Sequence, residues 1–410
     1  MSAPSLQKHW VTHHSTNPAN ANTDVQLFVG EYDGTPTGQD PKPVLMLHGR
    51  SVPVLAGYDL VLAGVSGDDA VKYSWAQQLA KLHYDVFLMD LQGSGLSPRP
   101  KMDDPCNANP AQRQDVLGPL AAACSTPPYP HELGNSESER DELATVVGFI
   151  QGKHPNKKID FVGWSAAGLV MGPYVLQNPD QVRSLFLLAP IYPPKGRWSK
   201  DPANPFGRPP EITGLPVTPP QAAFGFPMNV TSKTGFTLAW DRETASPLQR
   251  DAGMADRVWA AMMDNDSEGS KWGPLLASGS HEGVLRYRNN YWWGWNDQTV
   301  PHRDAAGTPV LGERVPVAIV HGELDRTANT PAALPVPDVL RFSVPALYAA
   351  VPGTKKLMFQ LADASHSMVW ERAAQTLHHI TSDWLRDNRV YGRTDGSYYR
   401  ATDGDLISLE

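Results

Sequence analysis

The chain has 410 residues, 41% of them hydrophobic and 19% charged, a composition typical of a globular protein rather than a disordered one. This length corresponds to two or three domains of roughly 100–200 residues, or to one large domain with an insertion. The formal net charge of -8 argues against nucleic acid and anionic membranes as partners, because both bind basic surfaces.

No apolar run approaches the roughly 18–20 residues that are needed to span a bilayer. The start of the chain, Met1–Trp10, is polar and has no apolar core of a secretory signal. We therefore expect a soluble protein without a membrane span, cytoplasmic by default. A mature secreted form would have the same sequence, and nothing here indicates the oligomeric state.

Short apolar runs alternate with helical patterns, which is typical of a mostly parallel sheet with helices on its faces. Residues His9–His13 and Val25–Gly30 are expected to form an antiparallel hairpin that leads into this sheet. The other predicted strands are Val44–Leu47, Asp85–Met89, Ile159–Val162, Leu185–Leu188, Val315–Val320 and Lys356–Leu361. The predicted helices are Tyr73–His83, Ser136–Gln151, Ala166–Leu176 and Trp370–Leu385.

The alternation stops between Pro190 and Val315, in a stretch rich in Pro, Gly and Trp. Two segments within it, Ala252–Asp264 and Gly283–Trp295, have helical patterns. A loop of this length without structure of its own would be improbable. We therefore interpret 191–313 as a largely helical cap domain, inserted before the penultimate strand of the core.

The core domain would then comprise residues 1–190 and 314–410. It would carry a loop insertion at 98–134 and a C-terminal appendage at 390–410. In the appendage, Asp403-Gly404 is a hairpin turn signal between two short strand patterns.

The two cysteines, Cys106 and Cys124, both lie in the 98–134 insertion. A disulfide between them would stabilise a loop of this size by about 3 kcal/mol, and it would indicate an oxidising compartment. The alternative is two unpaired thiols in a cytosolic protein.

The segment Gly163-Trp164-Ser165-Ala166-Ala167-Gly168 directly follows a predicted strand and opens a predicted helix. This is the context of a nucleophile elbow, in which a serine on a tight turn projects its hydroxyl above the sheet. Small residues two positions on either side, Gly163 and Ala167, allow the turn to close. The alternative is a chance turn of small residues.

A serine hydroxyl needs a base, and the base needs an orienting carboxylate. Asp325 and His366 both lie in loops at the ends of predicted strands, where sites gather in such sheets. Glu323 and Asp363 are rival acids. Of the 13 histidines, His366 has the best position.

The oxyanion of a tetrahedral intermediate needs backbone N–H donors, which we expect from Ala166 and Arg50. The Arg50 guanidinium could also bind a substrate carboxylate or merely pair with a surface acid. The glycine-rich segment Asp90–Ser97 lacks the ending of a phosphate-binding loop. No cysteine or histidine cluster has metal-ligand spacing, so we expect neither a metal nor a cofactor.

Aromatic residues are the candidate substrate contacts. Trp164 adjoins the serine, and Trp292 and Trp293 lie in the predicted cap beside a stripe at Tyr287, Tyr291 and Trp295. Such stripes are more often core than ligand contacts. The functional alternative is a pocket for an apolar or aromatic small molecule.

Five segments together resemble the α/β-hydrolase superfamily over about Val25 to Leu385, the cap excluded. They are Leu47-His48-Gly49, Asp90 to Ser97, Gly163 to Gly168, His321 to Asp325 and Ser365-His366. Ala167 departs from the pattern, because the common elbow has glycine there. The stretch from Asp104 through Cys106 and Cys124 to Pro130 also resembles an uncharacterised bacterial subgroup of these hydrolases, which implies a paired cysteine loop.

The resemblance implies an α/β-hydrolase fold with a mostly parallel eight-stranded sheet. It also implies a Ser165–His366–Asp325 triad that hydrolyses a carboxylic ester or lactone through an acyl-enzyme. Carbon–carbon bond hydrolysis or acyl transfer on the same triad is the alternative reaction. A ligand-binding receptor on this fold is the alternative of another class.

Overall fold

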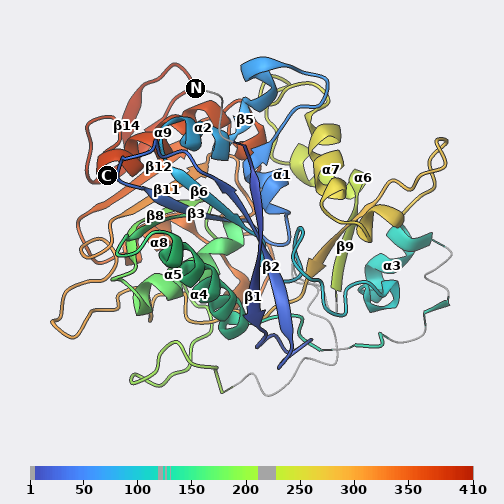
Figure 1. Ribbon diagram of the computed structural model, residues 1–410, viewed down its shortest axis with the longest axis horizontal. Coiled ribbons are helices and arrows are strands. Elements are labelled where there is room, and N and C mark those ends of the chain that lie inside the picture. Colours follow the sequence, from blue (N-terminus) through green and yellow to red (C-terminus); the bar gives the residue numbers. More distant parts are fainter. Residues whose placement is uncertain (1–4, 119–122, 125–126, 130, 211–227, 410) are drawn as a thin grey trace.

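The computed structural model describes residues 5–118, 123–124, 127–129, 131–210 and 228–409. Within these ranges the chain forms a large sheet flanked by helices (Figure 1). Parts of the predicted insertion at 98–134 and of the predicted cap at 191–313 lie outside the described residues.

The large sheet has ten strands among the described residues. In spatial order they are β1 (Gln7–His14), β2 (Asp24–Tyr32), β6 (Asp85–Met89), β3 (Pro43–Leu47), β7 (Ile159–Trp164), β8 (Val182–Leu188), β11 (Val317–Gly322), β12 (Lys356–Leu361), β13 (Gly396–Arg400) and β14 (Leu406–Ser408). Strands β6 to β13 pair in parallel, whereas β1, β2 and β14 are antiparallel to their neighbours. The mostly parallel α/β sheet predicted from the sequence is confirmed.

The helices lie in two groups about this sheet. In Figure 1, α4 (Ser136–Lys153), α5 (Gly168–Gln177) and α8 (Val344–Ala350) lie on one side, and α2 (Trp75–Lys81) and α9 (Ala374–Asp387) on the other. Strands β3 and β6 are buried at every position, because both faces of the sheet are covered.

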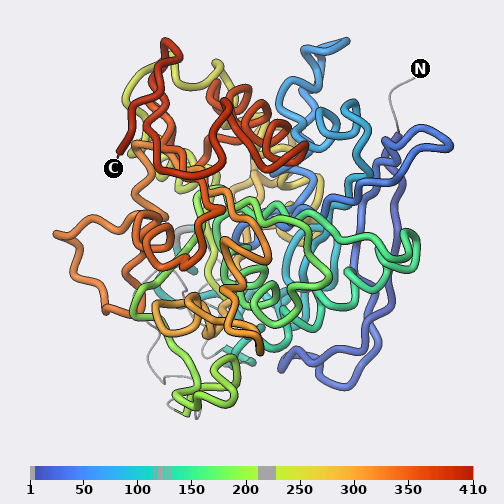
Figure 2. The backbone as a smooth tube through the Cα atoms, turned by 90° about the vertical axis from the view of Figure 1, so that its left-hand side faces the viewer, coloured from blue at the N-terminus to red at the C-terminus, as the bar shows by residue number. Residues whose placement is uncertain are grey.

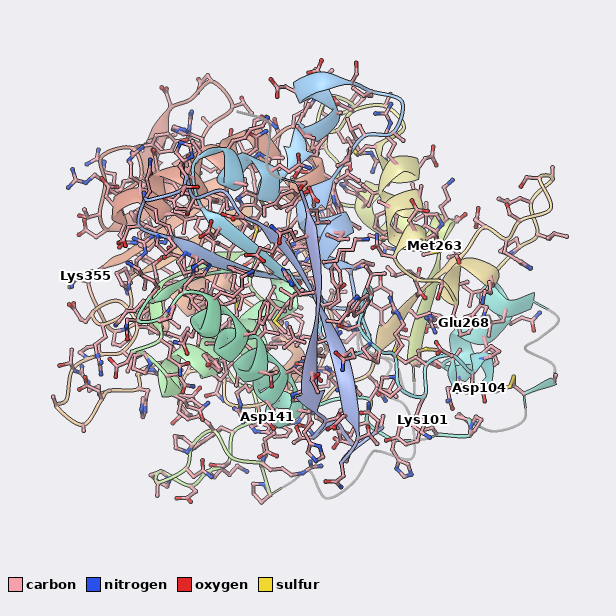
Figure 3. The ribbon with its side chains drawn as sticks, in the orientation of Figure 1. Lys101, Asp104, Asp141, Met263, Glu268 and Lys355 are labelled. Carbon is pink, nitrogen blue, oxygen red and sulfur yellow. A yellow bond between two sulfur atoms is a disulfide. The ribbon has the colours of Figure 1, made fainter. Side chains whose placement is uncertain are left out.

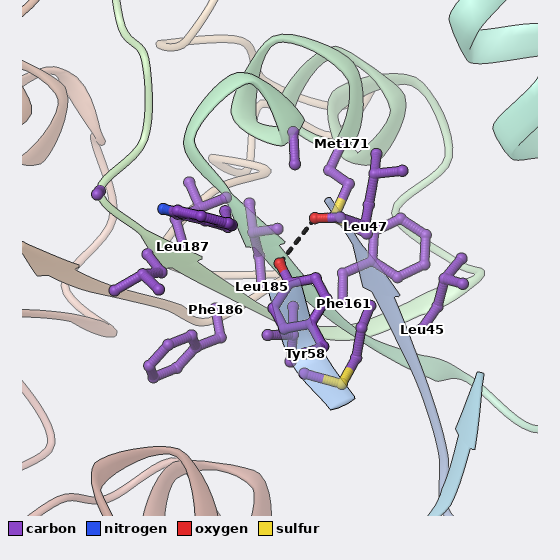
Figure 4. Packing of buried hydrophobic residues seen from close by; sticks show 14 of the residues in the cluster. Leu45, Leu47, Tyr58, Phe161, Met171, Leu185, Phe186 and Leu187 are labelled. Atoms are coloured by element: carbon purple, nitrogen blue, oxygen red, sulfur yellow. Dashed lines mark hydrogen bonds between the residues drawn. The ribbon is translucent and has the colours of Figure 1, made fainter. Parts of the chain in front are cut away.

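The short helix α1 (Val54–Tyr58) packs against β3. The Tyr58 hydroxyl donates a hydrogen bond of 2.7 Å to the Leu47 carbonyl, amid the buried side chains of Phe161 and Leu185 (Figure 4). Strand β3 therefore ends at a fixed point, and the loop that follows it starts from there.

The C-terminal residues extend the large sheet. In the 390–410 segment, which was predicted as an appendage of the core, β13 pairs in parallel with β12 and β14 then pairs with β13. These two strands extend the expected eight to ten. Figure 2 shows the consequence, with the N-terminal strands and the C-terminal segment on opposite sides of the molecule.

The segment between β8 and β11 contains α6 (Lys233–Asp241) and α7 (Met254–Asp264), and α7 was predicted. The prediction of a helix at Gly283–Trp295 is wrong, because β10 (Val284–Arg288) pairs there with β9 (Met228–Ser232). The helical spacing of Tyr287, Tyr291 and Trp295 was misleading, because the strand ends at Arg288 and contains only the first of the three.

The described part of the 98–134 insertion packs against this small sheet. Helix α3 (Pro110–Leu117) lies beside β9, where the backbone N–H of Asn109 donates to the Met228 carbonyl at 2.7 Å. A second hydrophobic cluster joins the two regions; its buried members are Ala19, Met102, Ala108, Val116, Leu117, Leu133, Met228, Val230, Trp272 and Val284.

The insertion and the segment with α7 and β10 lie on the same side of the molecule. Figure 3 shows Asp104 of the insertion on the same side as Met263 and Glu268, with Lys355 on the opposite side. The predicted disulfide between Cys106 and Cys124 is present in this region. In the described ranges, no helix is long and apolar enough to cross a membrane.

Candidate active site

Ser165 lies on a tight turn between β7 and the helical segment that leads into α5. Its φ of 57° is in the left-handed region, which non-glycine residues rarely adopt. Such local strain persists only where the surroundings enforce it, and it is concentrated at functional sites. The strand–turn–helix context expected for the serine is therefore present.

The turn accommodates Ala167 because Gly163, which faces it, has no side chain. A Cβ atom on Gly163 would lie 2.9 Å from the Met171 sulfur and 3.1 Å from the Ala167 Cβ. Since Gly163 has no Cβ, the methyl group of Ala167 has room. This contact explains how the chain accommodates alanine where the common elbow has glycine.

The three predicted triad residues come together in one hydrogen-bonded chain. The Ser165 Oγ lies 2.8 Å from His366 Nε2. On the other side of the ring, His366 Nδ1 lies 3.0 Å from Asp325 Oδ2 and 3.1 Å from Oδ1. A carboxylate only accepts, so Nδ1 carries the proton and donates it, which leaves Nε2 as the acceptor facing the serine hydroxyl.

Asp325 is fixed by its own loop. The side chain is buried, and its Oδ1 accepts hydrogen bonds from the backbone N–H groups of Thr327 at 3.0 Å and Ala328 at 2.8 Å. The rival acid Glu323 is exposed and accepts from the Asp363 N–H instead. Neither rival acid is placed at His366.

The charge balance around His366 favours its protonated form. Burial lowers the pKa of the imidazole, but the charge and hydrogen bond of Asp325 and the charge of Glu243 raise it further, so the net shift is upward. Trp164 also holds the loop, since its indole Nε1 donates to the His366 carbonyl at 3.1 Å.

The loop after β3 runs directly beside the serine. A Cβ on Gly49 would lie 3.2 Å from the Ser165 Cβ, so a side chain at this position would crowd the serine. His48 fixes the loop: its Nε2 accepts from the Leu91 N–H at 3.1 Å, and its Nδ1 donates to the Gly49 carbonyl. Burial lowers the pKa of His48 to about 3, which keeps it neutral. This role was missed, although the Leu47-His48-Gly49 motif marked the place.

A cavity of about 230 Å³ opens in front of the serine. Trp164, Ser165, Ala166, Arg50 and His366 all line it. Its other lining residues are Gly49, Val52, Ile191, Phe236, Ala239, Trp240, Glu243, Met262, Leu285, Tyr287, Thr327, Phe342, Ser367 and Trp370. The wall is therefore largely apolar and aromatic, and α6, α7 and β10 supply part of it.

Two charged side chains interrupt the apolar wall. The Arg50 guanidinium lies over the Tyr287 ring, 4.9 Å from its centroid, and burial lowers the pKa of Arg50 to about 9. Glu243 is the second, and no sequence motif pointed to it.

Trp292 and Trp293, predicted as substrate contacts, do not line this cavity. The Trp292 indole donates to Glu139 Oε2 at 2.6 Å, and the Trp293 indole donates to the Phe206 carbonyl at 3.1 Å. Both are buried, so the structure does not bring them to the cavity in front of Ser165. Their indole donors are used inside the protein.

Metal-ligating side chains do not cluster in the part of the chain that the structure describes. No group of three or more His, Cys, Asp or Glu residues there is arranged to hold a metal ion.

Comparison with known proteins gives a family match. A family model described as the alpha/beta hydrolase fold matches residues 42–373. No curated protein gives a significant match.

Solved structures with a similar chain course include three enzymes. One is a probable hydrolytic enzyme from Pseudomonas aeruginosa PAO1, at 13% identity over 94% of this chain and 95% of that one, with a TM-score of 0.46. Another is 2-hydroxy-6-oxo-6-phenylhexa-2,4-dienoate hydrolase from Rhodococcus sp. strain RHA1, at 13% identity, 91% and 96% coverage and a TM-score of 0.45. A third is a thermophilic esterase from Thermogutta terrifontis, at 15% identity, 93% and 98% coverage and a TM-score of 0.43.

Proposed function

The chain belongs to the alpha/beta hydrolase fold family and is a hydrolase, and from this premise we propose that it cleaves a carboxylic ester or lactone through an acyl-enzyme. Ser165 is the nucleophile, His366 the general base and acid, and Asp325 the residue that orients the imidazole. The observation that carries this proposal is the continuous hydrogen-bonded chain from the Ser165 Oγ through His366 to Asp325.

In the first half of the reaction, the Ser165 Oγ attacks the substrate carbonyl while His366 Nε2 takes the hydroxyl proton. The imidazolium then gives that proton to the leaving alkoxide, and the carbon–oxygen bond breaks. In the second half, His366 takes a proton from water, whose oxygen attacks the acyl carbon. The imidazolium then returns the proton to the Ser165 Oγ as the bond between the acyl carbon and Oγ breaks, which releases the acid and the free serine.

The negative charge on the carbonyl oxygen needs donors in place before the reaction. The backbone N–H groups of Ala166 and Arg50 are the proposed donors. Both residues line the cavity, Ala166 directly follows the nucleophile, and Gly49 brings the loop of Arg50 against Ser165. Ala166 also lies in the helical turn that opens α5, where the dipole favours an anion.

The cavity favours a small substrate with an apolar or aromatic acyl group. Its volume is about 230 Å³, and Trp164, Phe236 and Tyr287 contribute aromatic surface to its wall. Hydrolysis rates for a panel of p-nitrophenyl esters and lactones of graded size would show which acyl chain length the enzyme prefers.

A fluorophosphonate probe tests the nucleophile directly, because it reacts with activated serines. The probe should label the wild-type protein, and Ser165→Ala should abolish labelling and lower ester turnover by roughly 10⁴-fold or more. Ser382→Ala, on α9 and away from the lining of the cavity, is the matched control and should leave both unchanged. A folded wild-type protein that does not react would exclude every version of this mechanism.

A further inference from the structure

Glu243 connects the two loops that carry the proposed acid and base. It follows α6, it is only 8% exposed, and it lines the cavity in front of Ser165. Its Oε1 accepts from the backbone N–H of Arg326 at 3.0 Å and from the Thr327 hydroxyl at 3.0 Å. Its Oε2 accepts from the backbone N–H of His366 at 2.9 Å.

These three bonds join sites that are far apart in the sequence. Arg326 and Thr327 directly follow Asp325 in the loop after β11, whereas His366 lies in the loop after β12. One carboxylate therefore bridges the two loops. If the loops moved apart, the hydrogen bond between His366 and Asp325 would lengthen.

Glu243 is itself held from the other side. The Gln249 side-chain amide donates to the Glu243 carbonyl at 3.0 Å and to Glu371 Oε1 at 2.9 Å. Glu371 also accepts from the Trp240 indole at 2.7 Å and from the backbone N–H of Ser365 at 3.0 Å. The 240–249 segment is thus fixed to the His366 loop at two points.

We propose that Glu243 is a positioning residue for the triad, which clasps the acid loop to the histidine loop and places a second negative charge beside His366. This inference rests on the proposed function, because it assigns to Glu243 the task of holding a working base. The carboxylate is occupied by three protein donors, so it is not offered as a group that reacts with substrate.

Among the described residues, the charged groups around His366 come from four segments. Asp325 contacts the ring, Glu243 contacts the backbone, Glu371 acts through Ser365, and Arg50 lines the same cavity. Of the acids, Asp325 and Glu243 raise the pKa of His366. Removal of the Glu243 charge should therefore lower that pKa, and Glu371 offers a matched carboxylate that contacts the neighbouring residue instead.

The test is the pH dependence of fluorophosphonate labelling, measured as a second-order rate constant for the wild type, Glu243→Gln and Glu371→Gln. Glutamine keeps the shape of residue 243 but removes its charge and leaves one backbone donor without an acceptor. We expect the plateau rate of Glu243→Gln to fall by roughly 10-fold and the acid midpoint to move down by up to about one pH unit. Glu371→Gln should keep the wild-type midpoint.

If Glu243→Gln retains the wild-type midpoint, the inference about Glu243 is overturned. The proposed function is still supported in that case, provided that the probe labels the wild type. A folded wild type without labelling overturns both. Thr327→Val covers the case in which Glu243→Gln does not fold. It removes the hydrogen bond from the Thr327 hydroxyl to Glu243 and keeps the charge of Glu243. The Thr327→Val protein should react with the probe more slowly than the wild type, at an unchanged midpoint. A wild-type rate would count against the positioning role of Glu243.

Discussion

Ser165, Asp325 and His366 each lie just beyond the end of a strand of the large sheet. Parallel strands bring those ends to one edge, so the three side chains meet there. Glu243 carries no such mark, because it comes from a segment without a strand or motif signal. Its position depends on tertiary packing, which a local pattern does not encode.

The orientation of the imidazole depends on the Asp325 carboxylate. Asp325→Asn keeps the size of the side chain but presents an N–H group or a weaker acceptor to His366 Nδ1, which favours the wrong tautomer. We expect kcat to fall by roughly 10⁴-fold with little change in folding. Steady-state kinetics on a reactive ester measure this loss. Glu323→Gln is the control, because Glu323 lies away from the ring, and it should leave kcat near the wild-type value.

The net upward shift of the His366 pKa sets the pH dependence of the reaction. His366 acts as a base only when it is neutral, so activity is lost as the pH falls through its pKa. The acid limb of the kcat/KM profile should therefore have its midpoint above roughly 6.5, the usual value for histidine. A midpoint well below that value would contradict the charge balance described for the site.

The strands β6 and β12 occur with the predicted bounds, because each is an apolar run between polar turn residues. Strand β10 was mistaken for part of a helix, because the aromatic stripe at Tyr287, Tyr291 and Trp295 has helical spacing, although only Tyr287 lies in the strand. The hairpin at β13 and β14 was recognised by its turn at Asp403-Gly404, but its pairing with β12 was not. A local pattern shows that a strand exists and leaves its partner open.

The close contact at the elbow makes β7 and α5 sensitive to one methyl group. Gly163→Ala would place a Cβ 2.9 Å from the Met171 sulfur and 3.1 Å from the Ala167 Cβ, so we expect a loss of about 1–3 kcal/mol of unfolding free energy. Urea denaturation measures the difference. Gly148→Ala in α4 is the control, because a Cβ there meets nothing within 4 Å; it should be neutral or stabilising by up to about 1 kcal/mol.

At the scale of the whole molecule, the described residues form two hydrophobic clusters. The large cluster fills the space between the sheet and its helices, and the smaller one joins the 98–134 insertion to β9 and β10. The Cys106–Cys124 disulfide closes a loop in the insertion, and the Arg113 guanidinium donates to the carbonyls of both cysteines. The disulfide therefore belongs to the smaller unit and not to the proposed triad.

Removal of the disulfide should act mainly on that unit. For a sequence separation of 18 residues, the double variant Cys106→Ser/Cys124→Ser should lose about 3 kcal/mol of unfolding free energy. Limited proteolysis should then cut first within 98–134, while the labelling rate of Ser165 in the intact fraction stays near the wild-type value. Cleavage that begins in the sheet strands would show instead that the two clusters unfold together.

The same sulfur–sulfur bond makes the history of a purified sample matter. Protein produced in a reducing host cytosol, or stored with dithiothreitol, would carry two thiols where the native loop has a covalent link. Two batches of identical sequence could then differ in heat tolerance and shelf life, and a thiol titration under denaturing conditions would tell them apart before any assay is run.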